Sequence, residues 1–234
     1  TSIDTHPHIM LRNEEGEENP DEELFEQRNP GGVKMAKYTM LAIERQYASG
    51  GRSIGKKVAR TLGVPYYGRE ILEMAAERSG QTADYIEHLE ETATNSLLYS
   101  LVAVYRAQRG ESGTVSPEDQ LLMAETQIIT ELAQEGPCVF IGRSAGMILK
   151  DRKDVLRVFI YADEEARTRR AVDEYGHDER EAPMILRRFD KRRANFYTVQ
   201  YNQRWGDRSG YHLSLDSGKL GEEACVRILL EAMK

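Results

Sequence analysis

Short apolar runs alternate with amphipathic segments from residue 38 to the end of the chain. The run YTMLAIER at 38–45 is rich in strand-forming residues and is followed by a glycine-rich turn. Over 54–62 the apolar positions recur at helical spacing, and Gly63 follows. The pattern therefore predicts a strand, a turn and then a helix that starts near Gly55.

The same alternation continues to the C-terminus. Further strands are predicted at 64–67, 137–142, 155–161 and 211–215, and further helices at 69–79, 82–108, 117–135, 143–150, 163–175, 180–200 and 221–233. The run PCVFIG is continuously apolar, which is typical of a strand buried on both faces. Strands that alternate with helices predict an α/β fold, with a parallel sheet, right-handed crossovers and helices on both faces.

Charge divides the chain into a tail and a folded body. Residues 1–35 hold nine acidic and three basic residues, whereas 36–234 hold 30 acidic and 29 basic residues. The tail has no apolar periodicity, so it is predicted to be disordered, either as a solvated extension or as an acidic arm that binds a partner. The nearly neutral body at 36–234 does not favour nucleic-acid binding.

Composition indicates in which cellular compartment the protein is expected. No apolar run approaches the roughly 20 residues that a membrane span requires, so no membrane association is expected. Cys138 and Cys225 lie in apolar runs, which favours buried, reduced thiols in a cytoplasmic protein. The apolar positions of the predicted helix at 82–108 could belong to the core or to the face of a homodimer.

The glycine-rich turn carries the first candidate chemistry. Its residues fit the spacing G-x-x-x-x-G-K of a phosphate-binding loop: Gly50, Gly51, Arg52, Ser53, Ile54, Gly55 and Lys56. Glycines let backbone amides curl around phosphate oxygens, the helix N-terminus faces the same anion, and Lys56 reaches the outer phosphates.

The hydroxyl that normally follows the lysine and binds Mg²⁺ is missing, because Lys57 stands there. Ser53, or a water molecule held by Glu44, could take its place. Glu44 could equally be a charge at the end of a strand that faces solvent.

Basic residues recur where later strands end. Arg143 follows the strand PCVFI, so it should reach the carboxyl edge of the sheet, where ligands bind in parallel α/β folds. Residues 167–193 hold nine more bases, of which Arg188 and Arg192 share a helix face. Most of these bases should be solvated, and at least two are expected to point at a phosphate.

Four stretches resemble the cytidylate-kinase-like family, relatives of the nucleoside monophosphate kinases in the P-loop class. They are RQYASGGRSIGKKVARTLGVPYYGREIL, CVFIGRSAGMIL, LRVFIYADEEARTRR and DKRRANFYTVQYNQRWGDRSGYHLSLDSGKLGEEA, and the resemblance spans about residues 38–234. The last stretch, with its DKxRAN…WGD…Y pattern, is the most specific. The resemblance implies a three-layer P-loop kinase fold with a five-stranded parallel sheet, a helical insertion at about 81–135 and a lid at about 170–190.

By resemblance, the chain is an ATP-dependent phosphotransferase that acts on a nucleoside monophosphate and uses ATP and Mg²⁺. Lys56, Arg143 and Arg188 would be catalytic, Gly50 to Lys57 would hold the donor phosphates, and the acceptor would contact Arg69, Arg143, Arg170, Arg188, Asp190 and Lys191. No side chain is assigned as a metal ligand. Ile141, Ser144 and Gly68 replace acids of the family pattern. The alternative is a nucleotide-binding P-loop sensor or interaction module without turnover.

Overall fold

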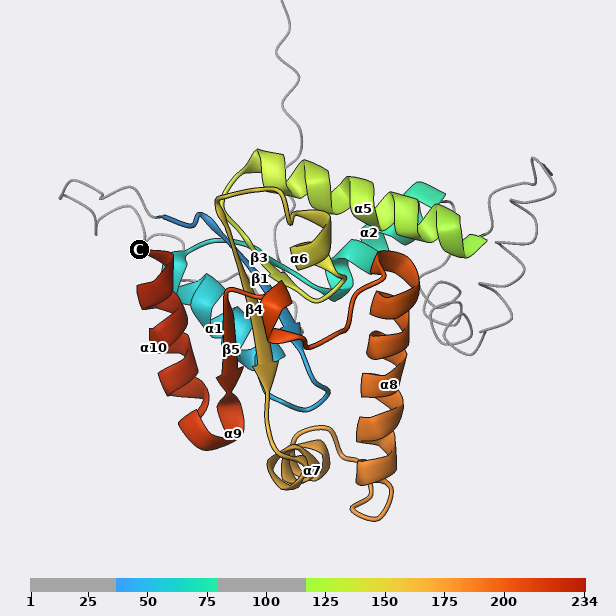
Figure 1. Ribbon diagram of the computed structural model, residues 1–234, viewed down its shortest axis with the longest axis vertical. Coiled ribbons are helices and arrows are strands. Elements are labelled where there is room, and N and C mark those ends of the chain that lie inside the picture. The colour runs from blue at the N-terminus through green and yellow to red at the C-terminus, as the bar shows by residue number, and fades with distance from the viewer. Residues whose placement is uncertain (1–36, 80–116) are drawn as a thin grey trace, which may run out of the picture. The chain divides into compact units, whose positions relative to one another are not determined.

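The computed structural model describes residues 37–79 and 117–234 (Figure 1). The predicted tail at 1–35 and the predicted helix at 82–108 lie outside these ranges. Across the two described ranges, no helix combines the length and the apolarity that a membrane span requires.

Five parallel strands form the sheet, in the order β2-β3-β1-β4-β5. They are β1 (Met40–Arg45), β2 (Tyr66–Tyr67), β3 (Val139–Ile141), β4 (Val155–Tyr161) and β5 (Leu213–Asp216). The predicted α/β class is confirmed, with β1 in the centre. Ile43 pairs with Ile141 on one side and with Val158 on the other, so the strands bring their carboxyl ends to one edge.

Helices cover both faces of the sheet, which gives three layers (Figure 1). One face carries α1 (Gly51–Leu62) and α10 (Glu222–Met233), and the other carries α2 (Arg69–Ser79), α5 (Pro117–Glu135) and α6 (Ala145–Ile148). Leu41 and Ile43 belong to the first core, and Met40 and Ala42 to the second. Because side chains alternate along a strand, Glu44 and Arg45 leave the end of β1 on opposite faces.

The remaining helices lie near the carboxyl edge and the C-terminus. Helix α7 (Glu164–Asp173) packs on α8 (Ala182–Tyr201), a 3₁₀ turn spans Arg208–Gly210, and α9 (Ser217–Leu220) precedes α10. The single helix predicted at 221–233 is thus preceded by a separate short one, because Gly221 breaks the chain direction with φ 77° and ψ 157°.

Two local predictions can be checked directly. The helix predicted at 143–150 is only four residues long, because Gly142, Arg143 and Ser144 all adopt left-handed φ angles of 79°, 57° and 52°. Both cysteines are buried and free, as predicted. Burial raises the pKa of Cys138 to about 12, so this thiol stays protonated.

Candidate functional site

The loop between β1 and α1 is shorter than the sequence pattern suggests. Helix α1 begins at Gly51, where the Ile54 amide already donates to the Gly50 carbonyl at 2.9 Å, so the predicted start near Gly55 is wrong. Ala48 and Gly50 take left-handed φ angles of 56° and 76° and turn the chain into the helix. In a P-loop the lysine and the hydroxyl lie in the first helical turn. Arg52 and Ser53 are the cationic and the hydroxyl side chain that the first turn of α1 contains.

Lys56 and Lys57 consequently lie one turn further along α1. The Lys56 amine is 5.1 Å from the centre of the Tyr66 ring on β2. Lys57 forms ion pairs at 3.0 Å with Glu222 and at 2.8 Å with Glu223 on α10. The structure thus places both lysines away from the loop, contrary to the role expected from the G-x-x-x-x-G-K spacing.

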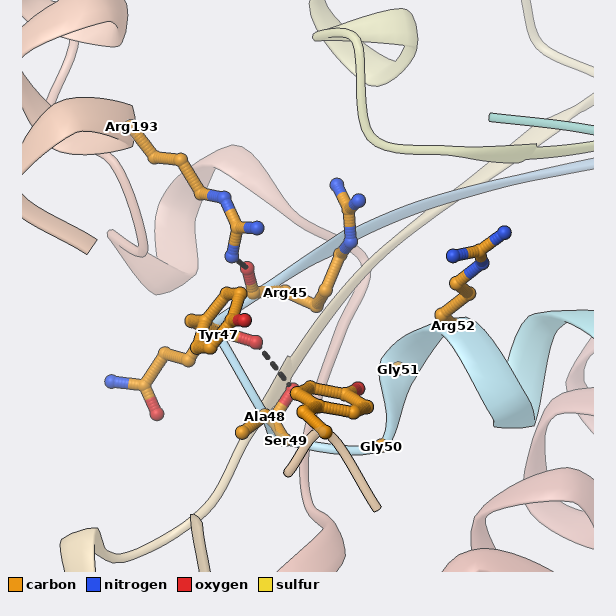
Figure 2. Close-up of a pocket in the computed structure, with 10 residues that line it drawn as sticks. Arg45, Tyr47, Ala48, Ser49, Gly50, Gly51, Arg52 and Arg193 are labelled. Carbon is orange, nitrogen blue, oxygen red and sulfur yellow. Dashed lines mark hydrogen bonds between the residues drawn. The ribbon is translucent and has the colours of Figure 1, made fainter. Parts of the chain in front are cut away.

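A cavity of about 260 Å³ opens between this loop and α8. Figure 2 shows Arg52 on the first turn of α1, Arg45 beside it, and Arg193 reaching toward Arg45 from α8. The lining residues are Arg45, Gln46, Tyr47, Ala48, Ser49, Gly50, Gly51, Arg52, Tyr175 and Arg193. Of the predicted loop residues, Gly50, Gly51 and Arg52 line the cavity, whereas Ile54 and Gly55 are buried under the sheet.

Three guanidinium groups line this cavity, those of Arg45, Arg52 and Arg193. Burial first, and then the positive charges of Arg193, Arg143 and Arg52, lower the pKa of Arg45 to about 9. Within the part of the chain that the structure describes, the guanidinium groups of Arg45 and Arg52 make no hydrogen bond or ion pair. The free amides at the N-terminus of α1 add a positive dipole at the same place. Together these groups give the cavity a positive charge that a multiply charged anion would complement.

Three arginine side chains, including that of Arg193, donate hydrogen bonds to backbone carbonyls of the loop. Arg193 donates to the Arg45 carbonyl at 2.7 Å, Arg167 to the Tyr47 carbonyl at 3.3 Å, and Arg170 to the Ala48 carbonyl at 3.3 Å. Arg170 also pairs with Glu222 at 3.0 Å and with Glu174 at 3.1 Å. Arg167 and Arg170 therefore position the loop.

Asp190 has a similar structural role. Its carboxylate accepts from the Tyr47 amide at 2.8 Å and from Arg167 at 2.5 Å. The Tyr47 ring stacks on Phe189 with centroids 4.3 Å apart, and its hydroxyl lies 2.8 Å from His177 Nε2. Helices α7 and α8 are thus fastened to the loop by both polar and aromatic contacts.

The other basic residues expected at the acceptor do not line the cavity. Arg69 pairs with Glu73 at 3.6 Å at the start of α2. Arg188 and Lys191 are exposed on α8, where the Arg188 guanidinium lies 5.6 Å from the centre of the Phe189 ring. Arg143 does not line the cavity either: it donates to Glu125 at 3.2 Å, and its positive charge helps to lower the pKa of Arg45.

Two important residues were not assigned from the sequence: Arg45 and Arg193. Arg45 is the last residue of β1, and Arg193 lies in the DKxRAN pattern. Their positions, directly after a central strand and within the most specific stretch, were the available signals. Glu44 is only 4% exposed, so the alternative that it faces solvent is wrong. Burial raises the pKa of Glu44.

Ser53 is the residue that would hold Mg²⁺ here. Its hydroxyl lies in the first turn of α1 and donates to Glu222 at 2.6 Å. Although burial opposes it, hydrogen bonds from Ser53 and Lys57 lower the pKa of Glu222, which keeps that carboxylate ionised beside the hydroxyl. Among the described residues there is no group of three or more acidic, histidine or cysteine side chains suited to a metal. Mg²⁺ commonly takes few protein ligands and completes its shell with phosphates and water, so Ser53 fits that pattern.

Comparison with known proteins places the fold and the family of the chain. An uncharacterized protein from Eubacterium ventriosum superposes with a TM-score of 0.62 at 21% identity, covering 83% of this chain and 97% of its own. Shikimate kinase from Bacteroides thetaiotaomicron (TM-score 0.45, 17% identity, 82% and 96% covered) and a gluconokinase from Sinorhizobium meliloti (0.44, 15%, 83% and 90%) are also similar. No curated protein matches the sequence. The profile of the cytidylate kinase-like family matches residues 40–219, and the chain belongs to that family, with its P-loop kinase-like fold.

Proposed function

We propose that this protein transfers the terminal phosphoryl group of ATP to a nucleoside monophosphate. The observation that carries the proposal is that Arg45, Arg52 and Arg193 line one cavity together with Gly50 and Gly51 at the start of α1. Donor and acceptor phosphates together bring several negative charges to one place. A site with this many cations supports binding both at once.

The chemistry needs positioning and charge neutralisation more than a strong base, because the acceptor oxygen is already anionic. In the proposed arrangement the α1 amides and Arg52 hold the donor phosphates. Arg45 and Arg193 neutralise charge on the transferred group, and Arg143 holds the acceptor phosphate. Bound Mg²⁺, held with the help of Ser53, would supply further neutralisation.

The loop's outward contacts support the same proposal. Arginines from α7 and α8 fix three loop carbonyls before any ligand arrives. A site whose donors are already oriented loses little energy to rearrangement when charge develops in the transition state. Removal of one such donor costs ~3 kcal/mol, about a hundredfold in rate.

The test compares Arg52→Ala with Lys56→Ala. Thermal shifts are measured with ATP, GTP and the four monophosphates, with and without Mg²⁺, and are followed by a coupled assay of ADP release. We expect Arg52→Ala to abolish the ATP-induced shift and the turnover, whereas Lys56→Ala retains both. If Lys56→Ala has the larger effect, the position assigned to Arg52 is wrong. If no nucleotide shifts the wild-type melting temperature, the phosphate site itself is wrong.

One observation favours a second candidate, a nucleotide sensor without turnover. None of the residues that line the described cavity is acidic, and Ile141 and Gly68 stand where the family pattern has acids. Carboxylates commonly place Mg²⁺ in kinases, so this set of residues would suit binding without transfer. An ATP-induced shift with no ADP release from any monophosphate would select the sensor.

A further inference from the structure

A tyrosine lines the arginine cavity from the segment that the sequence predicts to be a lid. Among the described residues from 170 to 190, Tyr175 alone lines the cavity together with Arg45 and Arg52. It lies in the connection between α7 and α8, just beyond the C-cap residue Glu174. This segment therefore contributes a phenol to the cavity, where arginines were expected.

Aromatic neighbours hold the Tyr175 ring in place. Its centroid is 5.6 Å from that of the Tyr47 ring, at an interplanar angle of 68°, and 6.4 Å from that of the His177 ring, at 89°. Tyr47 is itself fixed, because its ring stacks on Phe189 and its hydroxyl lies 2.8 Å from His177 Nε2. The Tyr175 ring is thus oriented before a ligand binds, which limits the energy lost to rearrangement.

The two tyrosines of the cavity differ in what their hydroxyl groups contact. The Tyr47 hydroxyl lies within hydrogen-bond distance of His177, whereas the Tyr175 hydroxyl makes no hydrogen bond within the described parts of the chain. The Tyr175 side chain is 41% exposed, so water can satisfy its hydroxyl in the free protein. The Tyr175 hydroxyl is therefore available to a ligand that enters the cavity.

The phenol of Tyr175 stays protonated at neutral pH. Burial, and after it the Glu174 carboxylate, raises the pKa of Tyr175. The positive charges of Arg170, Arg52 and Arg45 oppose this increase without cancelling it. A neutral phenol keeps its O–H group, so Tyr175 can donate a hydrogen bond.

The charges around the phenol indicate which acceptor it meets. None of the residues that line the described cavity is acidic, so no carboxylate from the lining competes for the O–H group. A further cation would add to the repulsion that already lowers the pKa of Arg45, whereas a phenol adds a donor without adding charge. A hydroxyl next to guanidinium groups that lack carboxylate partners suits an anionic oxygen, as in a phosphate.

We propose that the Tyr175 hydroxyl donates a hydrogen bond to a phosphate oxygen of the bound donor nucleotide. The inference rests on the proposed function, which brings that phosphate to Arg45 and Arg52. The contact belongs to the hydroxyl, so it can be removed while the ring stays in place. This separates it from a ring that stacks on the nucleotide base.

The test compares Tyr175→Phe with Tyr161→Phe. Tyr161 is the matched control, because it is 37% exposed and does not line the cavity. Calorimetry measures binding of ATP and of inorganic tripolyphosphate, a probe that has the phosphates but no nucleoside. We expect Tyr175→Phe to weaken binding of both ligands about tenfold, because a hydrogen bond to a charged group is lost. Tyr161→Phe should bind both as the wild type does.

The ligand-free Tyr175→Phe variant should melt at the wild-type temperature, because no group of the described structure loses a hydrogen bond. A lower melting temperature would show that the hydroxyl serves the fold, and would overturn the proposal. Unchanged binding of both ligands would overturn it as well. Weaker binding of ATP with unchanged binding of tripolyphosphate would show that the hydroxyl contacts the nucleoside, which also contradicts the proposal.

These results are distinguishable from failure of the proposed function. If ATP binding depends on Arg52 but not on the Tyr175 hydroxyl, the inference fails alone. If both ligands bind through Tyr175 but no monophosphate is phosphorylated, the inference stands and the proposed function fails. If the wild type binds neither ligand, both fail.

Discussion

Replacing Gly142 by alanine tests whether the Arg45 guanidinium binds phosphate. A Cβ atom at residue 142 would lie 1.8 Å from Arg45 Nη1 and 2.8 Å from its Cζ, which no packing permits. The Arg45 side chain ends in flexible atoms, so it would swing away while the backbone stays in place. The substitution therefore displaces one guanidinium group from the cavity without removing any charge from the protein.

The expected magnitudes follow from two separate effects. Gly142 has φ +79°, so alanine there adds left-handed strain of about 1–2 kcal/mol. For a chain of this size that strain lowers the melting temperature by about 2–8 °C. Loss of a hydrogen bond to a charged group costs about 1.5–3 kcal/mol. The ATP dissociation constant should therefore rise about 10- to 150-fold.

Gly176→Ala is the matched control. Gly176 has φ +69°, and a Cβ there would meet no atom within 4 Å, so it adds the strain without the clash. Both variants should lose a similar amount of thermal stability in a melting assay. Only Gly142→Ala should lose ATP affinity by calorimetry. If the two variants bind ATP equally well, Arg45 does not contact the phosphates and the assignment of the arginine site is refuted.

Three further predictions follow from the ion pairs and pKa values. Asp190→Asn leaves Arg167 without its buried carboxylate partner and should lower the free energy of unfolding by about 3–5 kcal/mol in urea denaturation. The surface variant Asp173→Asn is the control. A loss below about 1 kcal/mol would contradict the structural role of Asp190. Burial and the neighbouring arginines lower the pKa of Arg45 from its ordinary value to about 9, so ATP affinity should fall as pH rises from 8 to 10. The contribution of this group to stability should rise over the same range, because the unfolded chain holds the proton more tightly. A flat calorimetric profile over that range would count against it. The pKa of Glu222 is lowered from 4.5, so its stabilising contribution is present above pH 4.5 and is lost in more acidic solution. The Glu222→Gln variant should therefore lose less stability than the wild type when the pH falls below 4.5. Identical acid denaturation curves of the two proteins would contradict this prediction.

The sheet and most helices could be predicted because their signals are local. Each strand is a short apolar run, and alternation with helices determines parallel pairing. The start of α1 could not be predicted in the same way, because three glycines lie within six residues. Gly55 looked like part of the loop, yet its Cβ would lie 2.9 Å from Ile141 Cδ1 and 3.1 Å from Ile43 Cδ1. This glycine allows the helix to pack closely on the sheet, and such a tertiary contact cannot be recognised from the spacing of residues in the sequence.

The arginines show the same distinction within the site. The sequence indicates that bases gather at the carboxyl edge, and the structure confirms that several do. Which of them reach a cavity depends on nearby carbonyls and carboxylates that come from distant segments. Arg167 and Arg170 donate to the loop backbone, whereas the guanidinium group of Arg45 has no hydrogen-bond partner in the described structure. Spacing within one helix cannot separate these two outcomes.

These two sets of arginines depend on each other. Arg45, Arg52, Arg143 and Arg193 repel one another, as the lowered pKa of Arg45 records, so the free site is electrostatically unfavourable. The loop keeps its shape because Arg167, Arg170 and Asp190 hold its backbone from the outside. A bound anion would relieve the repulsion among the first set, while the second set already holds the loop in position. Variants of Arg45 and Arg52 should therefore weaken anion binding, with neutral or favourable effects on stability, whereas variants of the second set should lower both. Variants of Arg193 and Arg143 should also lower stability, because Arg193 donates to the Arg45 carbonyl and Arg143 pairs with Glu125. The difference in sign between Arg45 and Arg52 and the second set, measured by calorimetry and melting, separates residues that bind phosphate from residues that shape the loop.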